Sequence, residues 1–361
     1  MSQSDLFAPL SFKRGPAMKN RFMLAPLTNQ QSHTDGTLSD DEFHWLTLRA
    51  KGGFGLTMTC AAHVQAIGQG FAGQLGIFSD AHLPGLTRLA AAIKADDSIA
   101  VVQLHHAGMR SPKDLIGEAP VCPSDNAEFS ARALTTAEVE QLIEDFITAA
   151  ERAEKAGFDG VELHGAHGYI LCQFLSAEIN QRADRFGGNL TNRASVIAEI
   201  IAGIRTRCRP DFNLGLRLSP ERFGLKLAEI LELTQTLMTA GDLDYIDLSL
   251  WDVNKLPEEE AFKSQSLMAW FMALDRGSVR VGVAGKVLSA QTARDCLEKG
   301  ADFVLIGRGA ILHHDYPNQI KANPDFVPIA LPVTEAHLRH EGLSPTFVGY
   351  MRNWKGFVAE V

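Results

Sequence analysis

The sequence has few cysteines, and nothing in their spacing would pair them or gather them around a metal. The five cysteines among 361 residues are odd in number, widely spaced and free of any C-x-x-C motif. We therefore expect neither a disulfide framework nor a cysteine zinc site, and reduced thiols fit a reducing compartment. Cys60 lies in an apolar stretch, where cysteine more often acts as a small hydrophobic residue than as a reactive thiol.

A basic surplus, long apolar runs and a signal segment are also missing. Lysine and arginine number 34 against 43 aspartates and glutamates, which gives a formal net charge of −9. Proteins that bind nucleic acids usually carry a basic face, so we expect no nucleic-acid partner. No apolar run approaches the ~18 residues that span a bilayer, and residues 1–5 lack the basic and apolar regions of a signal peptide. We therefore expect a cytoplasmic protein without membrane contacts.

What the sequence does contain is a regular alternation of short apolar runs and helical segments. The runs are aliphatic and end at Gly, Pro, Asp or Ser, as is typical of buried parallel strands. Thr135 and Glu138 form a capping-box pattern that predicts a helix to about Ala156, and Ser289 precedes a second helix over 290–299. The eight runs cover residues 22–26, 55–64, 99–106, 159–165, 213–219, 245–250, 279–285 and 302–311.

Eight βα units in about 300 residues predict an α/β protein with a single (β/α)8 TIM-barrel domain over 1–361. We place the barrel at about 19–314, an elaborated loop after strand three at 109–134, and a C-terminal extension at about 315–361. An open doubly wound sheet would carry Gly-x-Gly-x-x-Gly after its first strand, where this chain has Ala25-Pro26-Leu27-Thr28. The barrel is therefore the favoured architecture.

The most informative motif follows the fourth run, at the barrel end where active sites collect. It reads His164-x-x-His167-Gly168-Tyr169. Two imidazoles at this spacing can donate to one carbonyl or nitro oxygen, with the phenol as a proton source. The same pair could bind zinc, but no Asp, Glu or Cys joins it, and we predict no metal site. A third interpretation is two buried structural histidines.

Charged and amide side chains occupy other strand ends. Arg217 lies in a buried run and needs an anionic partner, which is either an internal carboxylate, Glu162 or Asp247, or an electron-rich cofactor. Gln103 offers an amide donor and acceptor from a neighbouring run. Two further pairs follow runs seven and eight, where barrels commonly bind phosphate, and they suit a phosphorylated cofactor or a phosphorylated substrate. These pairs are Gly285-Lys286 and Gly307-Arg308.

Taken together, these motifs resemble the old yellow enzyme family of FMN-dependent NAD(P)H oxidoreductases. The resemblance covers about residues 5–312, in order. It rests on Lys19-Asn20-Arg21, Ala25–Thr28, Gln103–Gly108, His164–Tyr169, Arg185–Arg193 and Gly307-Arg308.

The resemblance implies bound FMN, NADPH or NADH as reductant, and hydride transfer to a small molecule, an α,β-unsaturated carbonyl or nitro compound. His164 and His167 would bind the substrate oxygen, and Tyr169 would protonate the carbon opposite the hydride. His105 and Trp251 would line the substrate pocket. The residues implied to bind FMN are Ala25, Pro26, Leu27, Thr28, Ala61, Gln103, Arg217, Gly285, Lys286, Gly307 and Arg308.

Two alternatives stay open from the residues alone. A flavin-free TIM-barrel lyase or aldolase acting on a phosphorylated substrate would explain the phosphate site, although none of the eight runs contains the lysine that a Schiff-base enzyme needs. A non-catalytic flavin-binding protein would keep the cofactor residues without needing Tyr169. The sequence also leaves open whether the chain forms a homo-oligomer.

Overall fold

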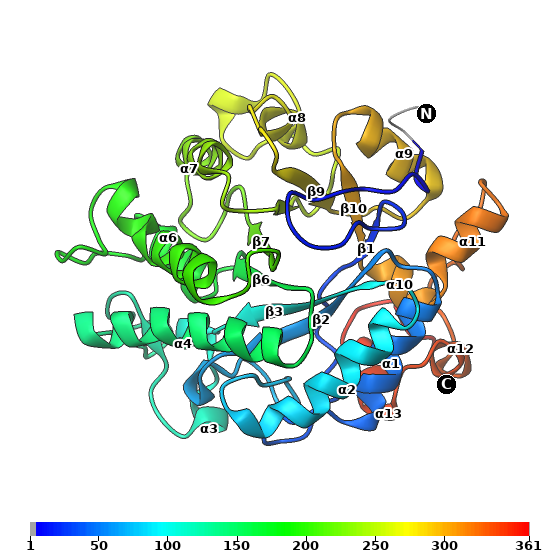
Figure 1. Cartoon of the computed structure of the whole chain (residues 1–361), viewed down its shortest axis with the longest axis horizontal. Helices are drawn as coiled ribbons and strands as arrows, with labels where there is room; N and C mark the ends of the chain where they lie inside the picture. Colours follow the sequence, from blue (N-terminus) through cyan, green and yellow to red (C-terminus); the bar gives the residue numbers. More distant parts are fainter. Residues whose placement is uncertain (1–4, 361) are drawn as a thin grey trace.

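Eight parallel strands close into a barrel in the computed structural model, which describes residues 5–360 (Figure 1). Their order around the barrel is β1-β10-β9-β8-β7-β6-β3-β2. The prediction of a (β/α)8 barrel is thereby confirmed. The barrel strands are β1 Phe22–Leu24, β2 Leu56–His63, β3 Ile99–His105, β6 Gly160–Gly165, β7 Asn213–Leu218, β8 Tyr245–Ser249, β9 Arg280–Ala284 and β10 Phe303–Ile306.

The eighth predicted run was too long, because it joined a strand to the helix that follows it. Gly307 ends β10 and precedes α10, Arg308–Leu312. Residues 309–312 are buried, so an apolar run continues through the turn. Periodicity alone cannot separate a buried strand from a short buried helix. The correction places Arg308 at the start of a helix rather than within a strand.

Helices cover the outside of the barrel. The capping box at Thr135 forms as predicted: the Glu138 backbone N–H donates to Thr135 Oγ1 at 3.2 Å, and the Thr135 N–H donates to Glu138 Oε2 at 2.7 Å. Ser289 caps α9 in the same way. No helix within residues 5–360 has both the length and the apolar character to cross a membrane. The helices around the barrel are α1 Asp40–Lys51, α2 Leu83–Lys94, α4 Thr136–Lys155, α5 Ile170–Leu175, α6 Leu190–Arg207, α7 Leu227–Ala240, α8 Leu267–Met272 and α9 Ala290–Glu298.

The remaining elements are short and lie mainly in the loops. The long loop after β3 holds a two-stranded sheet, in which β4 (Val121–Cys122) pairs with β5 (Arg132–Ala133). The N-terminal segment contributes Leu10, Phe12 and Met18 to an apolar cluster with inward-facing strand residues such as Tyr245. The short helices are η1 Ala66–Gly68, η2 Asp80–His82, η3 Gly108–Arg110, α3 Lys113–Ile116 and η4 Glu260–Phe262.

Three helices follow the barrel and gather beside α1 and α10 (Figure 1). They are α11 (Tyr316–Ala322), α12 (Glu335–His340) and α13 (Pro345–Arg352). The rings of Phe347 on α13 and Trp45 on α1 pack edge to face, with centroids 4.8 Å apart. The backbone N–H of Ser344 donates to Gln31 Oε1 at 3.1 Å. The C-terminal segment is thus docked on the end of the barrel that carries the β1–α1 loop.

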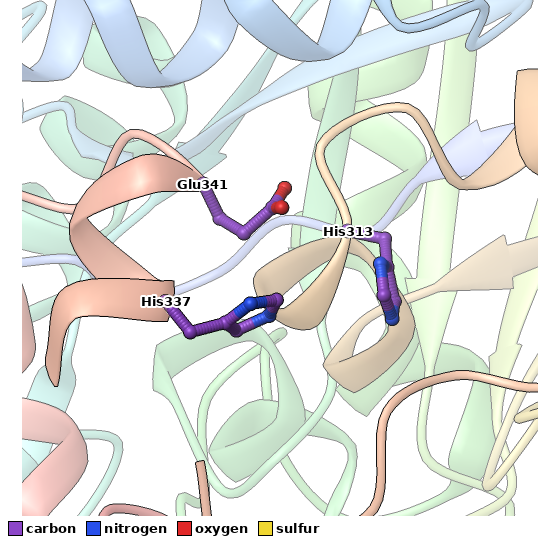
Figure 2. Close-up of side chains that lie close together, drawn as sticks. All are labelled: His313, His337 and Glu341. Atoms are coloured by element: carbon purple, nitrogen blue, oxygen red, sulfur yellow. The ribbon is translucent and has the colours of Figure 1, made fainter. Parts of the chain in front are cut away.

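His313, His337 and Glu341 lie close together where this segment meets α10 (Figure 2), with one potential ligand atom from each within 4.8 Å of the others. His337 Nε2 bonds to the carbonyl of residue 312 at 2.8 Å. Glu341 Oε2 accepts from the Nδ1 of His314 at 2.7 Å. The Ile329 N–H donates to His313 Nε2, which leaves the proton of a neutral His313 ring on Nδ1. Each of the three side chains thus has a hydrogen-bond partner. We interpret the cluster as a contact that attaches the C-terminal segment to the barrel.

Candidate active site

The carboxyl ends of the strands open onto two adjoining cavities of about 190 and 650 Å³. They share wall residues, so we treat them as one site. The residues common to both are Pro26, Leu27, His167, Tyr169, Arg217, Tyr350 and Trp354. Of the other sequence-predicted residues, Thr28, Ala61, Gln103 and His164 line the smaller cavity, and Ala25, Trp251, Gly285, Lys286, Gly307 and Arg308 line the larger one.

The turn between β6 and α5 brings the two predicted histidines and the tyrosine together. His167 and Gly168 both adopt left-handed backbone conformations, with φ of 60° and 70°. Such a conformation is uncommon for a residue other than glycine and often marks a functional site. Tyr169 is the N-cap residue of α5. The His164 ring centroid lies 5.0 Å from that of Tyr169 and 5.1 Å from that of His167.

Both histidines are neutral at pH 7. Burial lowers the pKa of His164 and of His167 well below the usual value, and the positive charge of Arg217 lowers both further. Arg217 Nη2 donates to Ser249 Oγ at 3.4 Å, and Ser249 Oγ lies 2.6 Å from His167 Nε2. With its lone pair facing Arg217, Ser249 donates its own proton to Nε2. We therefore assign the remaining proton of His167 to Nδ1.

The other two rings also keep a proton to give. The Ala166 N–H lies 3.4 Å from His164 Nδ1, which favours the tautomer with its proton on Nε2. Burial raises the pKa of the Tyr169 phenol, which therefore stays protonated at neutral pH. Within residues 5–360 the Tyr169 hydroxyl has no hydrogen-bond partner, and its ring borders both cavities. The cluster thus offers two imidazole N–H groups and one free phenol.

Arg217 has the internal partner that the sequence allowed for. Its Nε lies 2.9 Å from Asp247 Oδ2, and both side chains are buried. Glu162 lies nearby and accepts from Gln103 Nε2 at 2.7 Å. Burial raises the pKa of Glu162 and of Asp247, and repulsion by Asp247 adds to the effect on Glu162. Arg217 is therefore both the counter-charge of two buried acids and a cation at the cavity wall.

The four residues after β9 and β10 border the other part of the site. Lys286 Nζ lies 3.0 Å from Asp252 Oδ2, whereas Arg308 forms no ion pair with any carboxylate of residues 5–360. Gly307 borders the larger cavity, and a Cβ added to it would make only ordinary contacts, with Leu27 at 3.6 Å and Ala25 at 4.0 Å. A free guanidinium beside such a cavity suits a phosphate group.

The donor set as a whole fits FMN, which carries a phosphate on one side and a polar ring edge on the other. Gly285, Lys286, Gly307 and Arg308 would hold the phosphate. Gln103 and Arg217 would face the polar ring edge, with Ala25, Pro26, Leu27, Thr28 and Ala61 bordering the rings. Glu162 already takes one amide N–H of Gln103, so Gln103 keeps its second N–H and its oxygen for a ligand.

His105 was expected to line the substrate pocket, but the structure places it outside both cavities. It is 1% exposed, borders neither cavity, and its Nδ1 lies 3.0 Å from Gln74 Nε2. Its ring lies behind Tyr169, at 4.4 Å between centroids. The side chain therefore packs against the tyrosine. Trp251, by contrast, is 50% exposed, and its ring centroid is 6.1 Å from that of His167.

Sequence reasoning missed cavity residues that come from outside the strand ends. Tyr350 and Trp354, on and just after α13, border both cavities, and Phe71 borders the smaller one. Arg110, in the loop after β3, borders the larger cavity beside Tyr169. For Tyr350 and Trp354, the sequence offered only their i, i+4 spacing. That spacing places both residues on one helix face but does not show which part of the protein the face lies against.

Comparison with known proteins gives a consistent result. The model of the NADH:flavin oxidoreductase / NADH oxidase family matches residues 5–325. The probable NADH-dependent flavin oxidoreductase YqiG of Bacillus subtilis (strain 168) is 38% identical over 330 residues, 88% of this chain and 87% of that protein. Morphinone reductase in complex with tetrahydroNAD superposes with a TM-score of 0.77 at 26% identity, over 92% of this chain and 94% of that one. The fold also matches the old yellow enzyme homologue from Zymomonas mobilis, with a TM-score of 0.78 at 24% identity, over 92% and 96% of the two chains.

Proposed function

We propose which reaction this chain catalyses, starting from its family. The chain belongs to the NADH:flavin oxidoreductase / NADH oxidase family. It is an NAD(P)H-dependent flavin oxidoreductase of old yellow enzyme type, with FMN as cofactor and NADH or NADPH as reductant. A flavin-free lyase or aldolase and a flavin-binding protein without catalysis are thereby excluded.

The reaction is the reduction of a small molecule with an activated C=C bond, an α,β-unsaturated carbonyl or nitro compound. When bound, FMN supplies the hydride for the β-carbon, while the protein supplies orientation and electrostatics. One observation carries this assignment. The phenol of Tyr169, which is protonated and has no hydrogen-bond partner within residues 5–360, lies beside two neutral imidazoles, His164 and His167, at one cavity.

His164 and His167 bind the substrate oxygen. Negative charge collects on that oxygen as the β-carbon accepts a hydride, and each well-placed donor then contributes roughly 3–4 kcal/mol. The contact from Arg217 through Ser249 fixes the proton of His167 on Nδ1, so this ring is prepared as a donor before substrate binds.

Tyr169 protonates the neighbouring carbon. Its raised pKa keeps the phenol in its acid form across the neutral range, and its free hydroxyl has no competing contact within residues 5–360. A positioned acid of this kind contributes on the order of 10²–10⁴ in rate.

The test separates the two half-reactions of the FMN-loaded enzyme under anaerobic conditions. In Tyr169→Phe, reduction of the flavin by NADPH or NADH should be nearly normal. Reoxidation by 2-cyclohexenone, followed by stopped-flow absorbance, should slow by on the order of 10²–10⁴. Nitro compounds, which need no immediate protonation at carbon, should slow much less. Tyr350→Phe is the matched control, because it removes the other tyrosine hydroxyl at the same cavity, and it should slow enone reduction far less.

Equal slowing of the enone and nitro reactions would mean that Tyr169 positions substrate rather than delivering a proton. If neither reaction slows, the acid is another group and the assignment is wrong. Failure of the wild-type enzyme to reduce any enone or nitro compound, despite normal reduction by NADH or NADPH, would refute the proposed reaction itself.

A further inference from the structure

Arg110 is a cation at the mouth of the site that the proposed reaction does not use. It ends η3, directly after β3, and its side chain is exposed at the wall of the larger cavity. Its guanidinium carbon lies 4.9 Å from the centroid of the Tyr169 ring, and its Nη1 donates to the His167 carbonyl oxygen. Two contacts therefore hold the charge beside the residues of the proposed chemistry.

Arg110 has no negative partner among the residues that the structure describes. Within residues 5–360 it forms no ion pair, although acidic residues outnumber basic ones in this chain. The other cations at the cavity either form an ion pair or lie at the proposed phosphate site. Arg217 is paired with Asp247 and Lys286 with Asp252. Arg308 forms no ion pair in the part of the chain that the structure describes, but it lies among the residues that would hold the FMN phosphate.

A purely structural role would not account for the side chain. The bond to the His167 carbonyl uses one of the five N–H donors of the guanidinium, and the stacking on Tyr169 uses only its face. The side chain is exposed and borders the larger cavity, so the guanidinium keeps donors for a ligand there. The positive charge also acts there: burial raises the pKa of Tyr169 and Arg110 partly offsets that rise, while burial, Arg217 and Arg110 all lower the pKa of His167.

We propose that Arg110 binds a carboxylate of the substrate, so that the enzyme prefers activated alkenes that carry a carboxylate. This inference rests on the proposed function and names its substrate class. A guanidinium binds a carboxylate through two parallel N–H···O bonds, which fix orientation as well as adding affinity. Bound in this way, the substrate is oriented from a point next to Tyr169 and His167.

The experiment compares one enone in charged and neutral form: 4-oxo-2-pentenoate and its methyl ester. Anaerobically reduced, FMN-loaded enzyme is mixed with each compound, and flavin reoxidation is followed at rising concentration. The wild type should favour the acid. Arg110→Met should lower the second-order rate constant for the acid roughly 10- to 100-fold more than for the ester, the usual effect of losing a hydrogen bond to a charged group. Arg110→Lys should restore part of the preference.

Two controls isolate the charge. Arg222→Met removes another arginine near the mouth, one that lies over Trp251 and pairs with Glu258, and it should leave the acid-to-ester ratio as in the wild type. The ester itself reports any disturbance of His167 or Tyr169 in the Arg110 variants, because such a disturbance slows both compounds alike.

Three outcomes would overturn the proposal. An acid-to-ester ratio that is the same in Arg110→Met and wild type shows that Arg110 does not bind the carboxylate. An unchanged ratio with slower flavin reduction by NADPH or NADH assigns Arg110 to a phosphate of the nucleotide instead. If the wild type is reduced by NADH but reoxidised by neither compound, the proposed reaction fails and the substrate assignment fails with it.

Discussion

Replacing Arg217 with methionine should separate its observed role as partner of buried acids from its proposed role as a cation beside the flavin. Arg217 Nε lies 2.9 Å from Asp247 Oδ2, and Glu162 is also buried close by. Removing the cation leaves two buried carboxyl groups without a counter-charge. Breaking such a pair from one side typically costs about 3–5 kcal/mol of folding free energy.

The sign of the pH dependence follows from the acids. Burial already raises the pKa of Asp247 and Glu162 above their unfolded values, and loss of Arg217 raises both further. An acid with a raised pKa in the folded state costs no stability below its unfolded pKa and destabilises increasingly as pH rises toward the folded pKa. The wild type and the variant both keep these acids protonated below the wild-type pKa values, about 6 for Asp247 and about 8 for Glu162, so the extra destabilisation of Arg217→Met should be small at pH 5, grow above about pH 6 and still be rising at pH 8.

The double variant Arg217→Met/Asp247→Asn distinguishes the roles. Removing the stranded charge should restore most of the stability, measured by urea unfolding with saturating FMN. The midpoint potential of the flavin should be lower than in the wild type by roughly 30–60 mV in both variants. This difference corresponds to about 1.4–2.8 kcal/mol for a two-electron couple. A double variant no more stable than the single one would refute the ion-pair argument, and a wild-type midpoint with FMN retained would refute the flavin argument.

Two further predictions concern the same region. Glu162→Gln removes a buried acid whose raised pKa makes the wild type lose stability as pH rises above about 4.5. The advantage of the variant in urea unfolding should therefore grow by up to ~1.4 kcal/mol per pH unit between pH 5 and pH 8, and a constant difference would contradict this. A para-substituted phenol should bind the FMN-loaded enzyme with a long-wavelength absorption band, because its oxygen can take the N–H donors of His164 and His167. His167→Ala should lose most of the band, and equal binding by the double alanine variant would show that the pair is structural.

The barrel and most strand-end residues were predictable because both depend on local signals. Apolar runs of strand length, capping residues and turn glycines are all encoded within a few neighbouring positions. The carboxyl ends of parallel strands meet at one rim, so His164, His167, Arg217 and Gln103 could be assigned to one site from their places in the runs. The failure at residues 307–311 has the same origin, since an apolar run through a turn carries no local sign of the change.

Other features depended on contacts that no local pattern encodes. The pairing of Arg217 with Asp247 rather than Glu162 is decided by which side chain points toward the guanidinium inside the barrel. The family resemblance implied that His105 lines the pocket, but Gln74 and the ring of Tyr169 hold it behind the pocket wall. Arg110 follows the strand by five residues, and only the fold of η3 returns it to Tyr169.

The C-terminal helix shows why part of the pocket lies outside the reach of the barrel rules. One side of α13 is anchored in the core, where Phe347 packs on Trp45, while Tyr350 borders both cavities one turn later. None of these anchoring contacts involves His164, His167 or Tyr169, which are held by β6 and α5. Substitutions at Tyr350 and Trp354 can therefore reshape the cavity while the donors and the acid keep their positions. The residues of the proposed chemistry and a wall of the cavity are thus built by separate parts of the chain.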